Sequence, residues 1–111
     1  MGDKKDVWQG TLALMVLKTL ESMGSLHGYA IARRIEQVSD HTVIMNQGTI
    51  YPALLRLQQR KWIKAEWGIS ETGRRAKFYS LSKFGRQQIE TETENWERAA
   101  ATVARFLVPS S

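Results

Sequence analysis

The stretch from residue 47 to residue 81 places the strongest constraint on how this chain can fold. It begins with QGTIYPALLRLQQR, in which Ile50, Leu54 and Leu57 stand at positions i, i+4 and i+7 and predict one apolar stripe along a helix. Two short runs follow, KWIKAEW and FYSL, whose aromatic and β-branched residues are typical of strands. The segment between these runs contains two glycines and two arginines. We therefore expect a helix followed by a two-stranded hairpin with a cationic tip.

Positive charge is concentrated on this hairpin and its flanks. The chain has 111 residues and a formal net charge of +5. Residues 61–86 hold seven Lys or Arg and two Asp or Glu, whereas residues 87–111 hold two and four. A basic surface beside an acidic segment suits a nucleic-acid-binding protein with a separate assembly element. The alternative is that the basic side chains only solvate the surface, because charge runs are common.

The other segments predict a mainly α fold with a small β-hairpin. Helices are expected over residues 7–23 and within 25–39, where Glu36 would face outward; Asn46 would cap a third helix and Ser82 a fourth. Strands are expected over 62–67 and 76–81 with a loop at 68–75, and three β-branched residues at 42–44 predict one more short strand. Residues 1–82 would then form a winged helix-turn-helix DNA-binding domain. Residues 83–111 would form a long C-terminal dimerisation helix within the same compact unit.

The last predicted helix is too long for its own domain to cover. Its apolar residues recur at spacings of seven, seven and three, which approximates a heptad stripe. The first predicted helix has a broad apolar face that a partner's last helix could cover. The residues expected at this dimer interface are Leu14, Leu17, Ile89, Trp96, Val103 and Phe106.

Three blocks of the sequence resemble the PadR family of bacterial transcriptional regulators. They are HGYAIARRIEQ, QGTIYPALLRLQQRKWIKAEWG and RRAKFYSLSKFGRQQI, and the resemblance covers nearly the whole chain. The single C-terminal helix resembles the smaller subfamily. The resemblance implies a homodimeric winged helix-turn-helix protein in which the C-terminal helix packs against the partner's first helix. It also implies repression of detoxification or transport genes and release of DNA when a small effector binds, but it indicates no particular effector.

Residues on two elements are expected to contact DNA. Gln47, Thr49 and Pro52 would face base edges or methyl groups in the major groove, while Arg56 would contact a phosphate. Tyr51 either belongs to the core or contacts a phosphate, and in PadR-like proteins the matching tyrosine lies on the DNA side. The cationic tip would enter or flank the minor groove. The residues expected to contact DNA are Gln47, Thr49, Tyr51, Pro52, Arg56, Arg74, Arg75 and Lys77.

The motifs of common enzymes are absent. The sequence contains no GxGxxG, GxxxxGK[ST], HExxH or GxSxG pattern, no cysteine and only two histidines, which are far apart. We therefore expect no enzymatic activity, no cofactor and no metal site.

The sequence has no apolar run of about 18 residues, and its first residues lack the apolar core of a signal peptide. These features predict a cytoplasmic protein without a membrane partner.

The predicted function is sequence-specific binding of double-stranded DNA at an inverted-repeat operator. The expected regulator is a homodimeric repressor released by a small-molecule effector. The alternative is a winged-helix protein-interaction adaptor without specific DNA binding. Trp96 is expected either to pack in the dimer core or to stack against a small aromatic effector.

Overall fold

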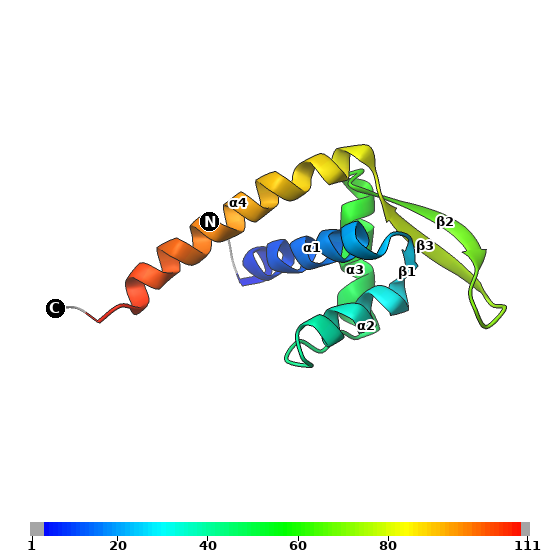
Figure 1. The fold of residues 1–111 in the computed structure, drawn as a ribbon, viewed down its shortest axis with the longest axis horizontal. Helices are drawn as coiled ribbons and strands as arrows, with labels where there is room; N and C mark the ends of the chain where they lie inside the picture. The colour runs from blue at the N-terminus through cyan, green and yellow to red at the C-terminus, as the bar shows by residue number, and fades with distance from the viewer. Residues whose placement is uncertain (1–3, 110–111) are drawn as a thin grey trace.

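The computed structural model describes residues 4–109, with side chains from residue 10 onward. Within these residues the fold is mainly helical with a small antiparallel sheet, as predicted (Figure 1). Residues 1–3 and 110–111, at the ends of the two expected segments, lie outside the described residues. The elements in order are α1 (Lys4–Met23), β1 (Leu26–His27), α2 (Gly28–Val38), α3 (Gln47–Gln59), β2 (Ile63–Ile69), β3 (Arg75–Leu81) and α4 (Lys83–Leu107).

The hydrophobic core lies between the first three helices and the sheet. The predicted stripe of α3 is confirmed, because Ile50, Leu54 and Leu57 are all buried. Leu12 and Val16 of α1 join them in one cluster. Burying these side chains stabilises the fold by roughly 1.5–3 kcal/mol for each Leu or Ile.

The sheet has the strand order β1–β3–β2, and its third strand is not the predicted one. Leu26 and His27 pair with β3, whereas residues 42–44 lie in the connection between α2 and α3. The prediction of a strand at 42–44 was wrong because local bonds hold that connection in a turn. Thr42 donates both its backbone N–H and its hydroxyl to the carbonyl of Ser39, at 3.1 and 2.7 Å.

The hairpin of β2 and β3 is longer than predicted, and its loop is correspondingly shorter. Gly68, Ile69 and Arg75 belong to the strands. The backbone N–H of Ser70 donates to the carbonyl of Arg74 at 2.8 Å and closes the turn. Gly73 has φ +80°, a left-handed conformation that glycine adopts at little cost.

The predicted N-caps are confirmed. Asn46 Oδ1 accepts the backbone N–H of Thr49 at 3.0 Å, and Ser82 Oγ accepts that of Gly85 at 2.9 Å. Each cap satisfies a backbone donor that the helix itself leaves free. The start of the third helix, which carries the expected base-reading residues, is therefore set by a side chain next to them.

Helix α4 begins on the body of the molecule and then leaves it (Figure 1). Its start is fixed against the residue that precedes β2, because Ser82 donates its backbone N–H to the Trp62 carbonyl at 3.0 Å and Gly85 packs on the same group. Ile89, two turns on, is still buried. Every described residue from 94 to 109 is exposed. The extents of 61 × 29 × 25 Å reflect this projecting helix.

Candidate nucleic-acid interface

Helix α3 presents one exposed face opposite its buried stripe. Gln47, Gly48, Tyr51 and Pro52 are exposed on it. Leu55 lies one turn beyond Tyr51 on the same face and is 55% exposed. The predicted set omitted Leu55, although its spacing of four from Tyr51 and its position off the buried stripe could have indicated it. The exposed face is therefore part polar and part apolar.

Thr49 and Arg56 lie at the edges of this face and are half-buried. The Thr49 hydroxyl donates to Asn46 Oδ1 at 3.1 Å, so the side chain is held against the cap of the helix. Arg56 lies in the last turn of α3. Gln47 is thus the most freely presented polar side chain of the predicted base-reading residues.

Tyr51 packs against the start of α2. A Cβ atom added to Gly28 would lie 2.7 Å from a ring carbon of Tyr51, so only glycine allows this approach. The tyrosine nevertheless remains 41% exposed. Burial raises the pKa of the core residue Tyr79, and the nearby Tyr51 raises it further. Tyr51 is therefore a partly exposed side chain whose ring packs against Gly28 of α2.

The hairpin, or wing, carries an aromatic and cationic face. Trp67 pairs with Lys77, and Ile69 pairs with Arg75, so these four side chains share one side of the ribbon. The Arg75 guanidinium lies 4.5 Å from the centroid of the Trp67 ring, which fits a cation–π contact. Trp67 is 60% and Ile69 69% exposed. Sequence reasoning missed this contact because it predicted Arg75 to lie in the loop.

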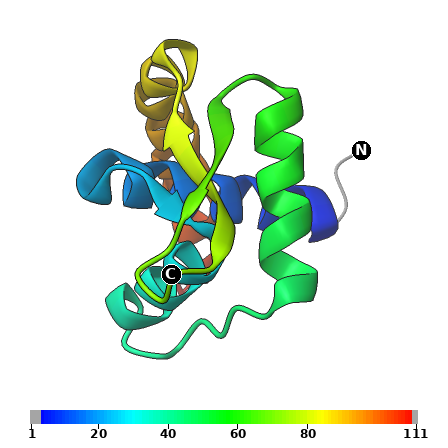
Figure 2. The same ribbon diagram turned by 90° about the vertical axis from the view of Figure 1, so that its right-hand side faces the viewer.

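The cations of the wing have no carboxylate partner in the described part of the chain. Between residues 10 and 109 the ion pairs are Lys18–Glu21 on α1 and Arg33–Glu36 on α2, so neither involves the wing. Arg74 and Arg75 are exposed and Lys77 is half-buried. In Figure 2 the hairpin lies beside α3, and its tip points to the same lower side of the molecule as the start of α3. The wing thus carries positive charge without a carboxylate partner toward the side of the molecule on which α3 begins.

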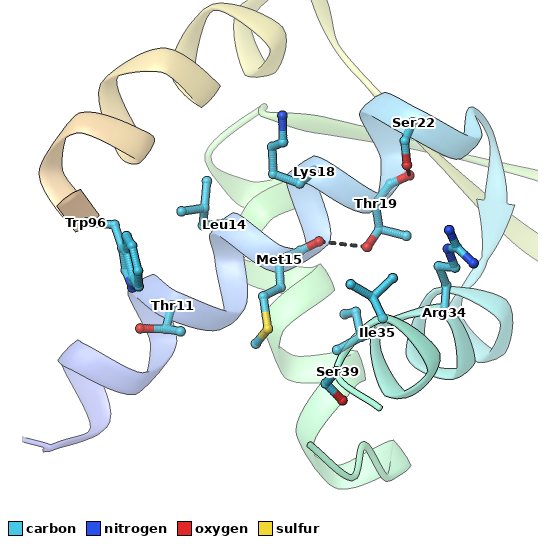
Figure 3. A pocket seen from close by; sticks show the side chains of 11 residues that line it. Thr11, Leu14, Met15, Lys18, Thr19, Ser22, Arg34, Ile35, Ser39 and Trp96 are labelled. Atoms are coloured by element: carbon cyan, nitrogen blue, oxygen red, sulfur yellow. Dashed lines mark hydrogen bonds between the residues drawn. The ribbon is translucent and has the colours of Figure 1, made fainter. Parts of the chain in front are cut away.

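A cavity of about 580 Å³ lies away from this surface, between α1, α2 and α4. In Figure 3 Trp96 of α4 closes one end, Leu14 and Met15 line the α1 side, and Arg34 rises from α2. Its walls are mostly apolar, and Lys18 and Arg34 are the charged residues among them. The lining residues are Thr11, Leu14, Met15, Lys18, Thr19, Ser22, Arg34, Ile35, Val38, Ser39 and Trp96.

The residues expected at the dimer interface fall into two groups. Leu17 is fully buried and Ile89 is 5% exposed, and both belong to the core of the chain itself. They are therefore not available to a partner, which corrects the expectation for these two residues. Trp96, Val103 and Phe106 are 50, 55 and 82% exposed, and Leu14 is half-buried at the cavity.

No group of three or more His, Asp or Glu side chains is placed to hold a metal ion within the described residues. In the same part of the chain, no helix is long and apolar enough to cross a membrane.

The helices, the three-stranded sheet and the projecting hairpin together define a winged helix-turn-helix protein. The model of the PadR-like family of transcriptional regulators matches residues 16–91, and the chain belongs to this family. It is a family of transcriptional regulators and not of enzymes.

Relatives differ in how much of their length this chain spans. A 37.1 kDa protein in transposon TN4556 of Streptomyces fradiae is 37% identical over 86 residues, which are 78% of this chain but only 23% of that protein. A transcriptional regulator from Clostridium thermocellum is 27% identical, with 93% of this chain and 99% of that chain covered and a TM-score of 0.82. PadR of Bacillus subtilis, solved in complex with operator DNA, is 26% identical, with 72% and 45% covered and a TM-score of 0.62.

Proposed function

We propose that this chain is a transcriptional regulator that binds double-stranded DNA in a sequence-specific way. The observation that carries the proposal is the presence, on one small domain, of three wing cations without a carboxylate partner, Arg74, Arg75 and Lys77, and of an exposed face on α3. In helix-turn-helix proteins the second helix of the motif enters the major groove with its first residues against the bases. Similarity to a PadR protein solved with operator DNA supports the same mode of binding here.

The proposed contacts divide between bases and backbone. Gln47, Thr49 and Pro52 face base edges, and Leu55 adds an apolar surface suited to a thymine methyl group. Tyr51 and Arg56 contact phosphates, which orient the protein without reading sequence. The wing contacts a flanking minor groove, where a narrow, A·T-rich stretch attracts arginine. The residues proposed to contact DNA are Gln47, Thr49, Tyr51, Pro52, Leu55, Arg56, Arg74, Arg75 and Lys77.

The proposed active form is a homodimer. Residues 1–82 bind DNA, and residues 83–111 assemble the dimer. Exposed Trp96, Val103 and Phe106 of α4 support this division, with Leu14 of the partner's α1 as their cover. A twofold dimer presents two copies of α3, which is why the proposed operator is an inverted repeat.

The regulator is proposed to be a repressor that a small aromatic effector releases from DNA. The cavity beside Trp96 is suited to such a ligand, because its walls are largely apolar and include the indole ring of Trp96. An effector can release DNA only if it binds more tightly to a dimer conformation that does not bind DNA than to the one that does.

Planar aromatic compounds should quench tryptophan fluorescence much more in the native protein than in Trp96→Phe. Equal quenching in both would leave Trp96 with a packing role alone.

The experiment that tests DNA binding is a gel shift with random-sequence duplex DNA. Affinity should be measurable at low salt and fall steeply as salt rises, because binding releases counterions from the phosphates. A protein that binds no duplex at low salt would instead be the adaptor, which assembles with other proteins. The proposal also places the regulator in the cytoplasm, where its DNA target would be.

A further inference from the structure

Glu36 is a buried acidic residue in the last turn of α2, next to the connection that leads to α3. It is 6% exposed, although the helical pattern predicted an outward position. That prediction was wrong because the connection from α2 to α3 folds back over the side chain. Glu36 Oε2 accepts the backbone N–H of Met45 at 2.9 Å, and this hydrogen bond is itself buried. Burying a carboxylate is costly unless the group is paired or accepts hydrogen bonds, so the contacts of this side chain matter for the stability of the connection.

Glu36 contacts the connection at both ends. Its backbone carbonyl accepts the N–H of His41 at 2.8 Å, early in the connection, and its carboxylate accepts Met45 at the end. Asp40 and His41 have φ 53° and 63°, left-handed values that are unfavourable for non-glycine residues. The two contacts of Glu36 therefore span a segment whose backbone conformation few non-glycine residues adopt.

The second contact lies directly beside the start of α3. Met45 is 7% exposed and belongs to the core, and the next residue, Asn46, caps α3. A displacement of Met45 would move the cap and Gln47 after it. Arg33 Nη1 lies 3.4 Å from Glu36 Oε1, but the Arg33 side chain is 55% exposed, so this ion pair is the outer and weaker contact.

We propose that Glu36 is a positioning residue that sets the orientation of α3 for base recognition. The inference rests on the proposed function, because it assumes that α3 reads bases. Base contacts need accurate placement, whereas the wing and the phosphate contacts act through charge over longer distances. Loss of the Glu36 carboxylate should therefore reduce sequence discrimination more than overall affinity for DNA.

The test compares Glu36→Ala, Glu36→Gln and the core variant Ile31→Val, all kept well below their unfolding temperatures. Glutamine keeps an oxygen that can accept the Met45 N–H, whereas alanine leaves that donor buried without a partner. Ile31→Val weakens the same helix without touching Glu36. The readouts are the ratio of affinities for a duplex selected by the native protein and a random duplex, and the hydrogen exchange of the Met45 amide in the free protein.

We expect Glu36→Ala to lower the affinity ratio about tenfold and to speed exchange of the Met45 amide. Glu36→Gln should have an affinity ratio and an exchange rate close to those of the native protein, and Ile31→Val should leave the affinity ratio unchanged. An unchanged ratio in a folded Glu36→Ala protein, or an equal fall in Ile31→Val, would overturn the inference. If Glu36→Ala does not fold, Glu36→Gln still tests the inference. A native affinity ratio and native exchange of the Met45 amide in this variant would support the role of the hydrogen bond, and loss of both would refute it. If the native protein discriminates between no duplexes, the proposed function itself fails, and the inference falls with it whatever the exchange shows.

Discussion

The two halves of α4 differ in what covers them. Near its start, Gly85 rests on the backbone of Trp62 and Ile89 is buried in the core. From residue 94 onward every described residue is exposed, including Trp96, Val103 and Phe106. Large apolar side chains along an uncovered helix are typical of a surface that binds another protein. The near half thus completes the fold of the chain, and the far half is free for assembly.

The largest effect is expected at Gly85. A Cβ there would lie 1.8 Å from the Trp62 carbonyl oxygen, and backbone cannot move aside as a flexible side chain can. Gly85→Ala should lower the free energy of unfolding by on the order of 4 kcal/mol in urea denaturation. The matched control is Gly10→Ala, which meets nothing within 4 Å and should stabilise α1 by roughly 0.5–1 kcal/mol. Similar stabilities for the two variants would refute the tight contact at the start of α4.

The second effect concerns the far half of α4. Trp96→Ala with Val103→Asp should give a folded monomer in sedimentation, because both side chains are at least half-exposed within the chain. Losing a tryptophan from a packed interface costs roughly 3–5 kcal/mol. The control is Glu94→Ala with Ala101→Asp, which introduces the same two residue types on the opposite face of the helix. A double variant at 96 and 103 that remained dimeric and bound DNA normally would remove α4 as the assembly element.

The third effect separates the wing from α4. Arg74→Ala with Arg75→Ala should weaken binding to all duplexes and lower the salt slope by about two units, because two phosphate-neutralising charges are lost. The fold should be unchanged, since both side chains are exposed. Arg98→Ala with Arg105→Ala removes the same charge from α4 and should change the slope little. Equal changes in the two double variants would mean that net charge alone governs binding.

The smallest effect is expected at single positions of α3. Gln47→Ala should cost roughly 1–3 kcal/mol on a selected duplex and little on random DNA, because only base contacts depend on sequence. Arg56→Ala should weaken both and lower the salt slope by about one unit. Titrations of both variants against both duplexes would check this. Equal losses on the two duplexes for Gln47→Ala would contradict its base-reading role.

What could be predicted from the sequence was mostly local. The stripe of Ile50, Leu54 and Leu57 and the caps at Asn46 and Ser82 depend on neighbours within one or two turns. The length of the last helix could also be predicted locally, because Ser82 caps its start and the next proline is Pro109.

What the sequence could not indicate depends on contacts between distant segments. Strand β1 exists because residues 26 and 27 lie beside β3, and their own sequence has no strand pattern. Leu17 and Ile89 fit an interface stripe as well as a core, and only the packing of α4 on α1 decides between them. In the site, the same applies to Tyr51 against Gly28, to Arg75 over Trp67 and to buried Glu36.

Selection of bound duplexes from a random pool by the native protein tests the central claim most directly. A dimer with α3 in the major groove should enrich an inverted repeat whose half-sites lie about one helical turn apart, roughly 34–36 Å. The variant Trp96→Ala with Val103→Asp, carried through the same selection, should lose that paired pattern. Retention of duplexes with no enriched sequence, or with single half-sites for both proteins, would contradict the account.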